Sequence, residues 1–159
     1  LPAKDKMSPP RYQALLNNQI PVVNLPDGQG TVRVIAGEFA GARGPAKTFT
    51  PIHVWDLSLA GNQRTELALP DGYTTVLVVL KGALRVNGSE SIETAEAGLF
   101  DPIGQGIHIE CVQDTTALLL AGEPIDEPIV GQGPFVMNTA QEIHQAIEDY
   151  RSGKIGHLR

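Results

Sequence analysis

Short apolar runs recur along the chain between residues 31 and 121, at intervals of about 8–12 residues and broken by glycine, proline or asparagine. Alternation is clearest in residues 48–59, where His53, Trp55 and Leu57 share one face of the predicted strand. Asn87 and Gly88 form the residue pair most typical of a two-residue hairpin turn. The predicted strands are 31–35, 48–59, 65–69, 73–80, 83–86, 91–95, 98–101, 106–112 and 115–121. Their spacing predicts an all-β fold, an antiparallel sandwich or barrel.

The bulk composition narrows the class of protein. A chain of 159 residues with 42% hydrophobic and 19% charged residues is typical of one globular domain. No apolar run approaches the roughly 20 residues needed to span a bilayer, so we expect no membrane partner. A net charge of −6 without a Lys/Arg cluster argues against direct nucleic-acid binding. Cys111 is the only cysteine, which excludes an internal disulfide and favours a cytoplasmic protein.

The two ends of the chain flank this β-rich region. Residues 1–27 are polar and rich in proline, and they predict an N-terminal arm or linker lying on a domain of residues 28–138. Thr139 and Glu142 form a capping box that starts a helix, and Gly153 ends it. Residues 139–153 are therefore predicted as one amphipathic helix of the same domain. Its apolar stripe consists of Ile143, Ala146, Ile147 and Tyr150.

The closing segment resembles a known family. Residues 122–150, GEPIDEPIVGQGPFVMNTAQEIHQAIEDY, resemble the C-terminal end of pirins. Residues 1–13, LPAKDKMSPPRYQ, resemble the pirin stretch that leads from the first cupin domain into the second. The resemblance implies a cupin-type jelly-roll β-barrel, or double-stranded β-helix, with one C-terminal α-helix and an N-terminal arm. It further implies that this chain is the second half of a bicupin.

The metal positions of the cupin pattern are occupied by unsuitable residues. Metal-holding cupins carry two histidines separated by one residue and then a glutamate, all ahead of a glycine turn. The strand that ends at Gly82 resembles the strand before this turn. Counting back from Gly82 places Ala68 and Pro70 at the histidine positions and Thr74 at the glutamate position. These side chains cannot supply a normal ligand set for a divalent ion. We therefore predict no metal and no cofactor in this chain, whereas the resemblance implies iron in the N-terminal cupin domain of the parent.

Two further histidines are candidates for a site. His108 and Glu110 lie in a segment that resembles a pirin signature, but they come one residue early. A slip of one residue reverses the face of a strand, so both side chains should point outward while Ile107, Ile109 and Cys111 fill the barrel. His53 is expected to be a hydrogen-bonded core residue. The alternative for His53 is a ligand-binding role in a barrel cavity, with Trp55 as a stacking wall.

These observations predict a metal-free C-terminal cupin domain with a structural or interaction role and no catalytic residue. The resemblance implies a parent with quercetin 2,3-dioxygenase activity in some members, or a regulatory role through protein partners. The expected partners are the N-terminal cupin domain of the parent, a second copy in a homodimer, and regulatory proteins. The alternative is a free-standing cupin that binds a small molecule or a metal inside its barrel, using His53, His108 and Glu110.

Overall fold

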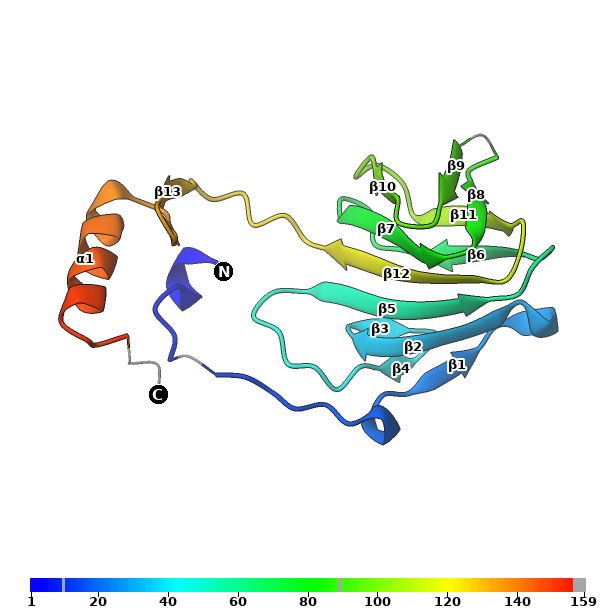
Figure 1. The fold of residues 1–159 in the computed structure, drawn as a ribbon, viewed down its shortest axis with the longest axis horizontal. Helices are drawn as coiled ribbons and strands as arrows, with labels where there is room; N and C mark the ends of the chain where they lie inside the picture. The colour runs from blue at the N-terminus through cyan, green and yellow to red at the C-terminus, as the bar shows by residue number, and fades with distance from the viewer. Residues whose placement is uncertain (10, 89, 156–159) are drawn as a thin grey trace. The chain divides into compact units, whose positions relative to one another are not determined.

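The computed structural model describes residues 1–9, 11–88 and 90–155. Its internal contacts divide the chain into two compact units. Among the described residues, 11–88 and 90–124 form the sandwich unit, and 1–9 with 125–155 form the terminal unit. Figure 1 shows the strands of the sandwich unit and the single α-helix of the terminal unit. Among the described residues, no helix is long and apolar enough to cross a membrane.

The sandwich unit consists of antiparallel strands in two main sheets. A six-stranded sheet has the order β1-β2-β5-β12-β7-β10, and a four-stranded sheet has the order β6-β11-β8-β9. Two short strands, β3 and β4, pair only with each other. The bounds are β1 Val22–Asn24, β2 Gly30–Ala36, β3 Glu38–Phe39, β4 Ala42–Arg43, β5 Ile52–Leu59, β6 Arg64–Ala68, β7 Thr74–Lys81, β8 Ala83–Val86, β9 Glu90–Glu93, β10 Ala97–Phe100, β11 Gly106–Cys111 and β12 Thr115–Gly122. Short 3-10 turns, η2 (Asn17–Gln19) and η3 (Pro26–Gly28), flank β1.

Alternation along the strands builds the core between the two sheets. In β5, the side chains of Trp55, Leu57 and Leu59 are buried, and β12 contributes Ala117, Leu119 and Ala121 from the neighbouring position. The four-stranded sheet closes the core from the other side with Leu67, Leu84, Val86, Ile92, Ile107, Ile109 and Cys111. The antiparallel all-β prediction is therefore confirmed.

The structure corrects two details of the predicted strands. Residues 48–51 precede β5 rather than belonging to it, and Pro51 has no backbone N–H to give to a neighbouring strand. Within the expected N-terminal arm, Val22–Asn24 is a strand that pairs with β2 in the register Val23↔Val32. The arm thus contributes the edge of the six-stranded sheet, which its proline-rich composition did not indicate.

Gly82 shows why the turn after β7 needs a glycine. Its φ of +94° lies in the region that side chains disfavour. A Cβ at this position would lie 2.6 Å from the carbonyl oxygen of Asp114. The turn therefore brings two backbone segments closer together than any other residue would permit.

The terminal unit contains a 3-10 turn η1 (Ala3–Asp5), a hairpin of β13 (Val130–Gln132) and β14 (Phe135–Met137), and the helix α1 (Ala140–Arg151). The predicted capping box is confirmed, because the Glu142 N–H donates to Thr139 Oγ1 at 3.2 Å and the Thr139 N–H donates to Glu142 Oε2 at 2.8 Å. Glu127 Oε2 accepts from the Ala3 N–H and from Asn138 Nδ2. These bonds tie residues 1–9 to the loop before the helix.

The buried face of α1 differs from the predicted stripe. Ile143 and Ala146 are buried as expected, but Tyr150 is 66% exposed and Asp149 is buried in its place. Gln145 Nε2 and Lys154 Nζ donate to Asp149 Oδ1 at 2.9 and 3.2 Å. These hydrogen bonds lower the pKa of the Asp149 carboxyl and allow a charged group at a covered position.

The predicted boundaries, an arm of residues 1–27 and a domain of residues 28–138, stay predictions. The assignment of helix 139–153 to that same domain stays a prediction.

Candidate functional site

The three positions counted as cupin metal positions lie on the outward face of the barrel wall. Ala68, Pro70 and Thr74 are all exposed. The inward positions beside them are held by Leu67, Leu69 and Thr75, which are 0%, 8% and 4% exposed. The count back from Gly82 is thus one residue out of register with the interior. The inward side chains are no better as ligands, since two are aliphatic and the third is a neutral hydroxyl.

The second candidate pair, His108 and Glu110, points away from the interior as predicted. Ile107, Ile109 and Cys111 are buried on the other face of β11. His108 Nδ1 lies 3.7 Å from Glu66 Oε2, and Glu110 Oε1 lies 3.0 Å from Arg64 Nε. Glu110 is thus paired with Arg64, and His108 lies beside Glu66, both across from β6 on the outer face of the sheet.

The residues present do not fit a cupin metal centre. Within residues 1–9, 11–88 and 90–155, no three His, Cys, Asp or Glu side chains come together in a way that could hold an ion. Cys111 is 5% exposed, and burial together with Asp114 raises the pKa of its thiol to about 11. A thiol held in its protonated form is a poor metal ligand.

His53 and Trp55 come together in an aromatic cluster at one end of the sandwich, as the shared strand face predicted. The His53 ring centre lies 5.1 Å from Trp55 and 5.7 Å from Tyr73, and Phe39 meets Trp55 edge-on at 4.9 Å. Burial lowers the pKa of His53, and Glu38 opposes this shift. The indole Nε1 of Trp55 is buried without a hydrogen-bond partner in the described chain. His53 is partly buried and accepts a hydrogen bond at Nδ1 from the Glu38 N–H. Its ligand-binding role stays a prediction.

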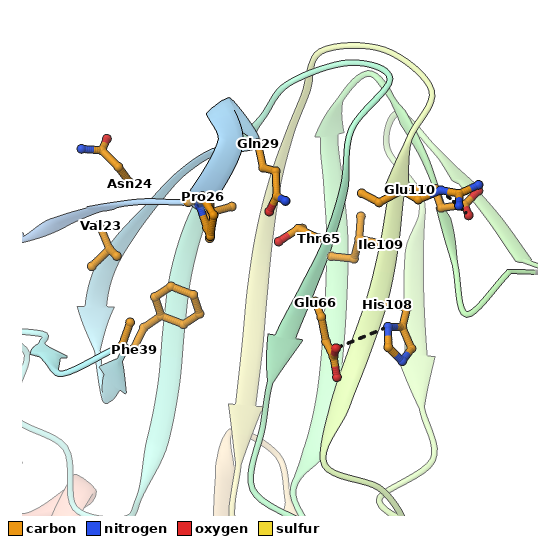
Figure 2. A pocket seen from close by; sticks show the side chains of 13 residues that line it. Val23, Asn24, Pro26, Gln29, Phe39, Thr65, Glu66, His108, Ile109 and Glu110 are labelled. Atoms are coloured by element: carbon orange, nitrogen blue, oxygen red, sulfur yellow. Dashed lines mark ion pairs between the residues drawn. The ribbon is translucent and has the colours of Figure 1, made fainter.

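Phe39, which contacts Trp55, also lines a groove of about 760 Å³. Figure 2 shows it between residues of β1, η3 and β3 on one side and residues of β6 and β11 on the other. Val23, Pro26 and Phe39 come from the six-stranded side, and Thr65 and Ile109 come from the four-stranded side (Figure 2). Gln29 extends into the space between them (Figure 2). Glu66, His108, Arg64 and Glu110 lie along one rim.

Sequence reasoning did not identify this groove. Gln29, Phe39 and Thr65 come from three separate segments, and none lies in a recognisable motif. Thr65 was assigned to a strand, but only the pairing of the sheets brings it opposite Gln29. No signal in a single sequence would have selected these residues, because the groove is a product of tertiary structure.

A family model and several known proteins match most of this chain. The family model described as "Pirin C-terminal cupin domain" matches residues 54–156. A Pseudomonas aeruginosa protein named "Putative quercetin 2,3-dioxygenase" is 48% identical over 154 residues, covering 97% of this chain and 54% of that protein. Human pirin is 33% identical and covers 100% of this chain, which spans 56% of the human protein.

The fold is that of a solved cupin relative. A crystal structure of quercetin 2,3-dioxygenase from Acinetobacter baumannii matches with a TM-score of 0.92 and 43% identity. The match covers all of this chain and 55% of that one. This similarity confirms the predicted cupin fold. The chain spans about half the length of the curated relatives that it matches.

Proposed function

This chain belongs to the pirin family as a C-terminal cupin domain, and we propose that it is the metal-free structural and interaction half of a two-cupin protein. The observation that carries the proposal is the composition of the barrel interior. At the positions around Leu67, Leu69 and Thr75, and along Ile107, Ile109 and Cys111, the inward side chains are apolar or neutral. Any iron-dependent step, including the quercetin 2,3-dioxygenase activity named for the relatives, then belongs to the other half.

The outer face of the six-stranded sheet supports an interaction role. Leu120 of β12 lies opposite Val76 of β7, and Leu99 of β10 lies on the far side of Val76. Leu118 and Val78 form the next pair along the same strands. Leu99 is 74% exposed and Leu80 is 54% exposed. A contiguous apolar surface on three neighbouring strands is typical of a surface that another protein domain covers.

The terminal unit also needs a neighbouring surface. Ile143 and Ala146 supply the buried aliphatic side chains of its described residues, 1–9 and 125–155. Several large apolar side chains remain exposed, with Ile129 at 83% and Met7 at 64%. A body of this size buries too little apolar surface to be stable by itself.

The additional length of the relatives suggests what covers these surfaces. Each matched curated relative extends beyond the region shared with this chain by nearly half of its own length. We take the occupant to be the preceding cupin domain of the parent. A homodimer and a regulatory protein are the competing occupants, and the experiment below separates them.

The test is co-expression of this chain with the protein segment encoded directly upstream of Leu1. We expect a stable one-to-one complex that Leu99→Glu weakens by about tenfold or more, since it buries an unpaired charge. Arg85→Glu is the matched control, because Arg85 is exposed on the outer face of the four-stranded sheet. If the two halves purify separately, or if this chain forms a homodimer that excludes the upstream segment, the assigned partner is wrong.

Metal analysis tests the metal-free part of the proposal. After chelator treatment, we expect the isolated chain to hold Fe, Ni, Cu and Zn far below one ion per chain. Near-stoichiometric metal that is lost in His108→Ala would instead support the alternative, a rebuilt metal site that uses His108 and Glu110.

A small molecule bound beside His53 and Trp55 is the second candidate function. The observation that favours it is the buried indole N–H of Trp55, which has no acceptor among the described residues. A ligand oxygen would satisfy this donor. Quercetin is the first probe, because relatives are named for it. A rise in melting temperature that is lost in His53→Ala would support this candidate, and no rise would remove it.

A further inference from the structure

The groove beside Phe39 exists because two unpaired sheet edges meet there. β1 is the edge of the six-stranded sheet, and β6 is the edge of the four-stranded sheet. The sandwich is thus open between them, and Figure 2 shows side chains from both edges facing the gap. Leu67, Leu69, Thr75 and His53 do not line this opening, whereas the outward pair His108 and Glu110 lies on its rim.

The walls of the groove are mostly apolar. Phe39 and Val23 are partly buried and pack against the core, while Leu25 and Ile109 are 8% and 1% exposed. The edge-on contact of Phe39 with the buried Trp55 fixes the position of the ring. The volume of about 760 Å³ lies within the range of small-molecule sites, roughly 300–1,000 Å³.

Two polar side chains line the groove, the Gln29 amide and the Thr65 hydroxyl. Both are only partly buried, so a molecule in the groove can reach them. The amide offers a donor and an acceptor, and the hydroxyl can serve as either. Because these groups come from opposite walls, one ligand molecule could bond to both while its apolar part contacts Phe39 and Ile109.

The rim charges disfavour an anionic ligand. Arg64 is paired with Glu110 at 3.0 Å, so its positive charge is compensated. Glu66 contributes a further carboxylate beside His108, and the whole chain has a net charge of −6. An added negative charge would therefore be repelled rather than held.

We propose that this groove is a binding site for a neutral, ring-containing molecule with a hydrogen-bonding group, held against Phe39 and bonded by Gln29 and Thr65. The site is independent of the proposed interaction role. The proposal gives a ligand to the C-terminal cupin domain, whose inward side chains are apolar or neutral.

Two fluorescent probes with the same ring skeleton test the charge preference. N-phenyl-1-naphthylamine is neutral with one N–H donor, and 8-anilino-1-naphthalenesulfonate adds a sulfonate. Trp55 is the only tryptophan and contacts Phe39, so energy transfer from Trp55 reports binding. We expect saturable one-to-one binding of the neutral probe with a dissociation constant on the order of 10 μM. The sulfonate should bind about tenfold more weakly.

Variants locate the bound probe. Thr65→Phe fills the groove from an edge strand and should reduce affinity by about tenfold or more. Gln29→Leu keeps the side-chain volume but removes the amide, and it should reduce affinity by a smaller factor. Leu99→Ser on the outer sheet face should leave the affinity unchanged.

Each result decides the proposal. Absence of saturable binding, equal binding of both probes, or full affinity in Thr65→Phe would overturn it. Loss of binding in Leu99→Ser would show that the probe binds on the outer sheet face, and this result would also overturn the proposal. Because Gln29 follows the 3-10 turn η3 on the rim of the sandwich, Gln29→Leu provides a second measurement if Thr65→Phe fails to fold.

Discussion

The backbone N–H of Glu38 donates a hydrogen bond to Nδ1 of His53 at 3.2 Å. Gly37 makes this contact possible, because a Cβ at residue 37 would collide with the His53 ring. With Nδ1 as acceptor, the neutral imidazole must carry its proton on Nε2. The relationship fixes the tautomer of His53 and links its protonation to the turn between β2 and β3.

Protonation of His53 should destabilise the protein. Burial lowers the pKa of His53, so in the unfolded chain the imidazole takes up a proton at a higher pH, near 6.5. The stabilising contribution is therefore complete above about pH 6.5 and is lost as the pH falls through the folded pKa. His53→Gln should flatten this part of the stability profile, measured by urea unfolding between pH 5 and pH 8. An unchanged slope in the variant would contradict the assignment.

Truncation of Leu119 should be among the most costly changes in the sandwich. Leu119 is 0% exposed and lies between Trp55 and Leu77 in the neighbouring strands. Leu119→Ala should lower the free energy of unfolding by about 2–5 kcal/mol, since it leaves a cavity. Leu99, which is 74% exposed, provides the matched control. Leu99→Ala should change the free energy of unfolding by less than about 0.5 kcal/mol. Equal losses in urea unfolding would show that the core is wrongly assigned.

Gly82→Ala should destabilise the protein more than Gly88→Ala does. Both residues have positive φ, +94° and +77°, which costs an L-residue about 1–2 kcal/mol. At Gly82 a Cβ would also contact the Asp114 carbonyl, whereas at Gly88 nothing lies within 4 Å. Gly82→Ala should therefore lose about 1–3 kcal/mol more than Gly88→Ala in thermal or urea unfolding. A smaller loss at Gly82 would argue against this packing of the turn.

The capping box should control the stability of the terminal unit. Thr139→Ala removes the acceptor for the Glu142 N–H and should cost about 1 kcal/mol, seen as faster amide exchange in α1. Thr139→Ser keeps an acceptor oxygen and should retain most of the protection. If the alanine and serine variants exchange alike, the cap does not stabilise the helix.

Local pattern was sufficient for much of the fold. Alternation in β5 placed Trp55 and Leu57 inward, and the Thr139 and Glu142 spacing gave the start of α1. Alternation also placed His108 and Glu110 outward, because a period of two leaves no freedom once the buried face is known. These features depend only on residues within one element.

Features that depend on tertiary partners were not predicted. Val22–Asn24 is flanked by Pro21 and Pro26, which favoured an arm, and it is a strand because it pairs with the edge of β2. Asp149 is buried because Gln145 and Lys154 bond to it, which a hydrophobic stripe cannot anticipate. The count back from Gly82 relied on a fixed spacing and selected Ala68, Pro70 and Thr74, which are exposed in the structure.

The covered thiol of Cys111 makes the native chain suitable for selective labelling. With its pKa raised to about 11, the thiol is almost entirely protonated at the pH of maleimide coupling and reacts slowly. A single cysteine introduced at exposed Asn24, on the lip of the groove, would therefore carry a dye or spin label alone. The protein needs no cysteine-free background for such measurements.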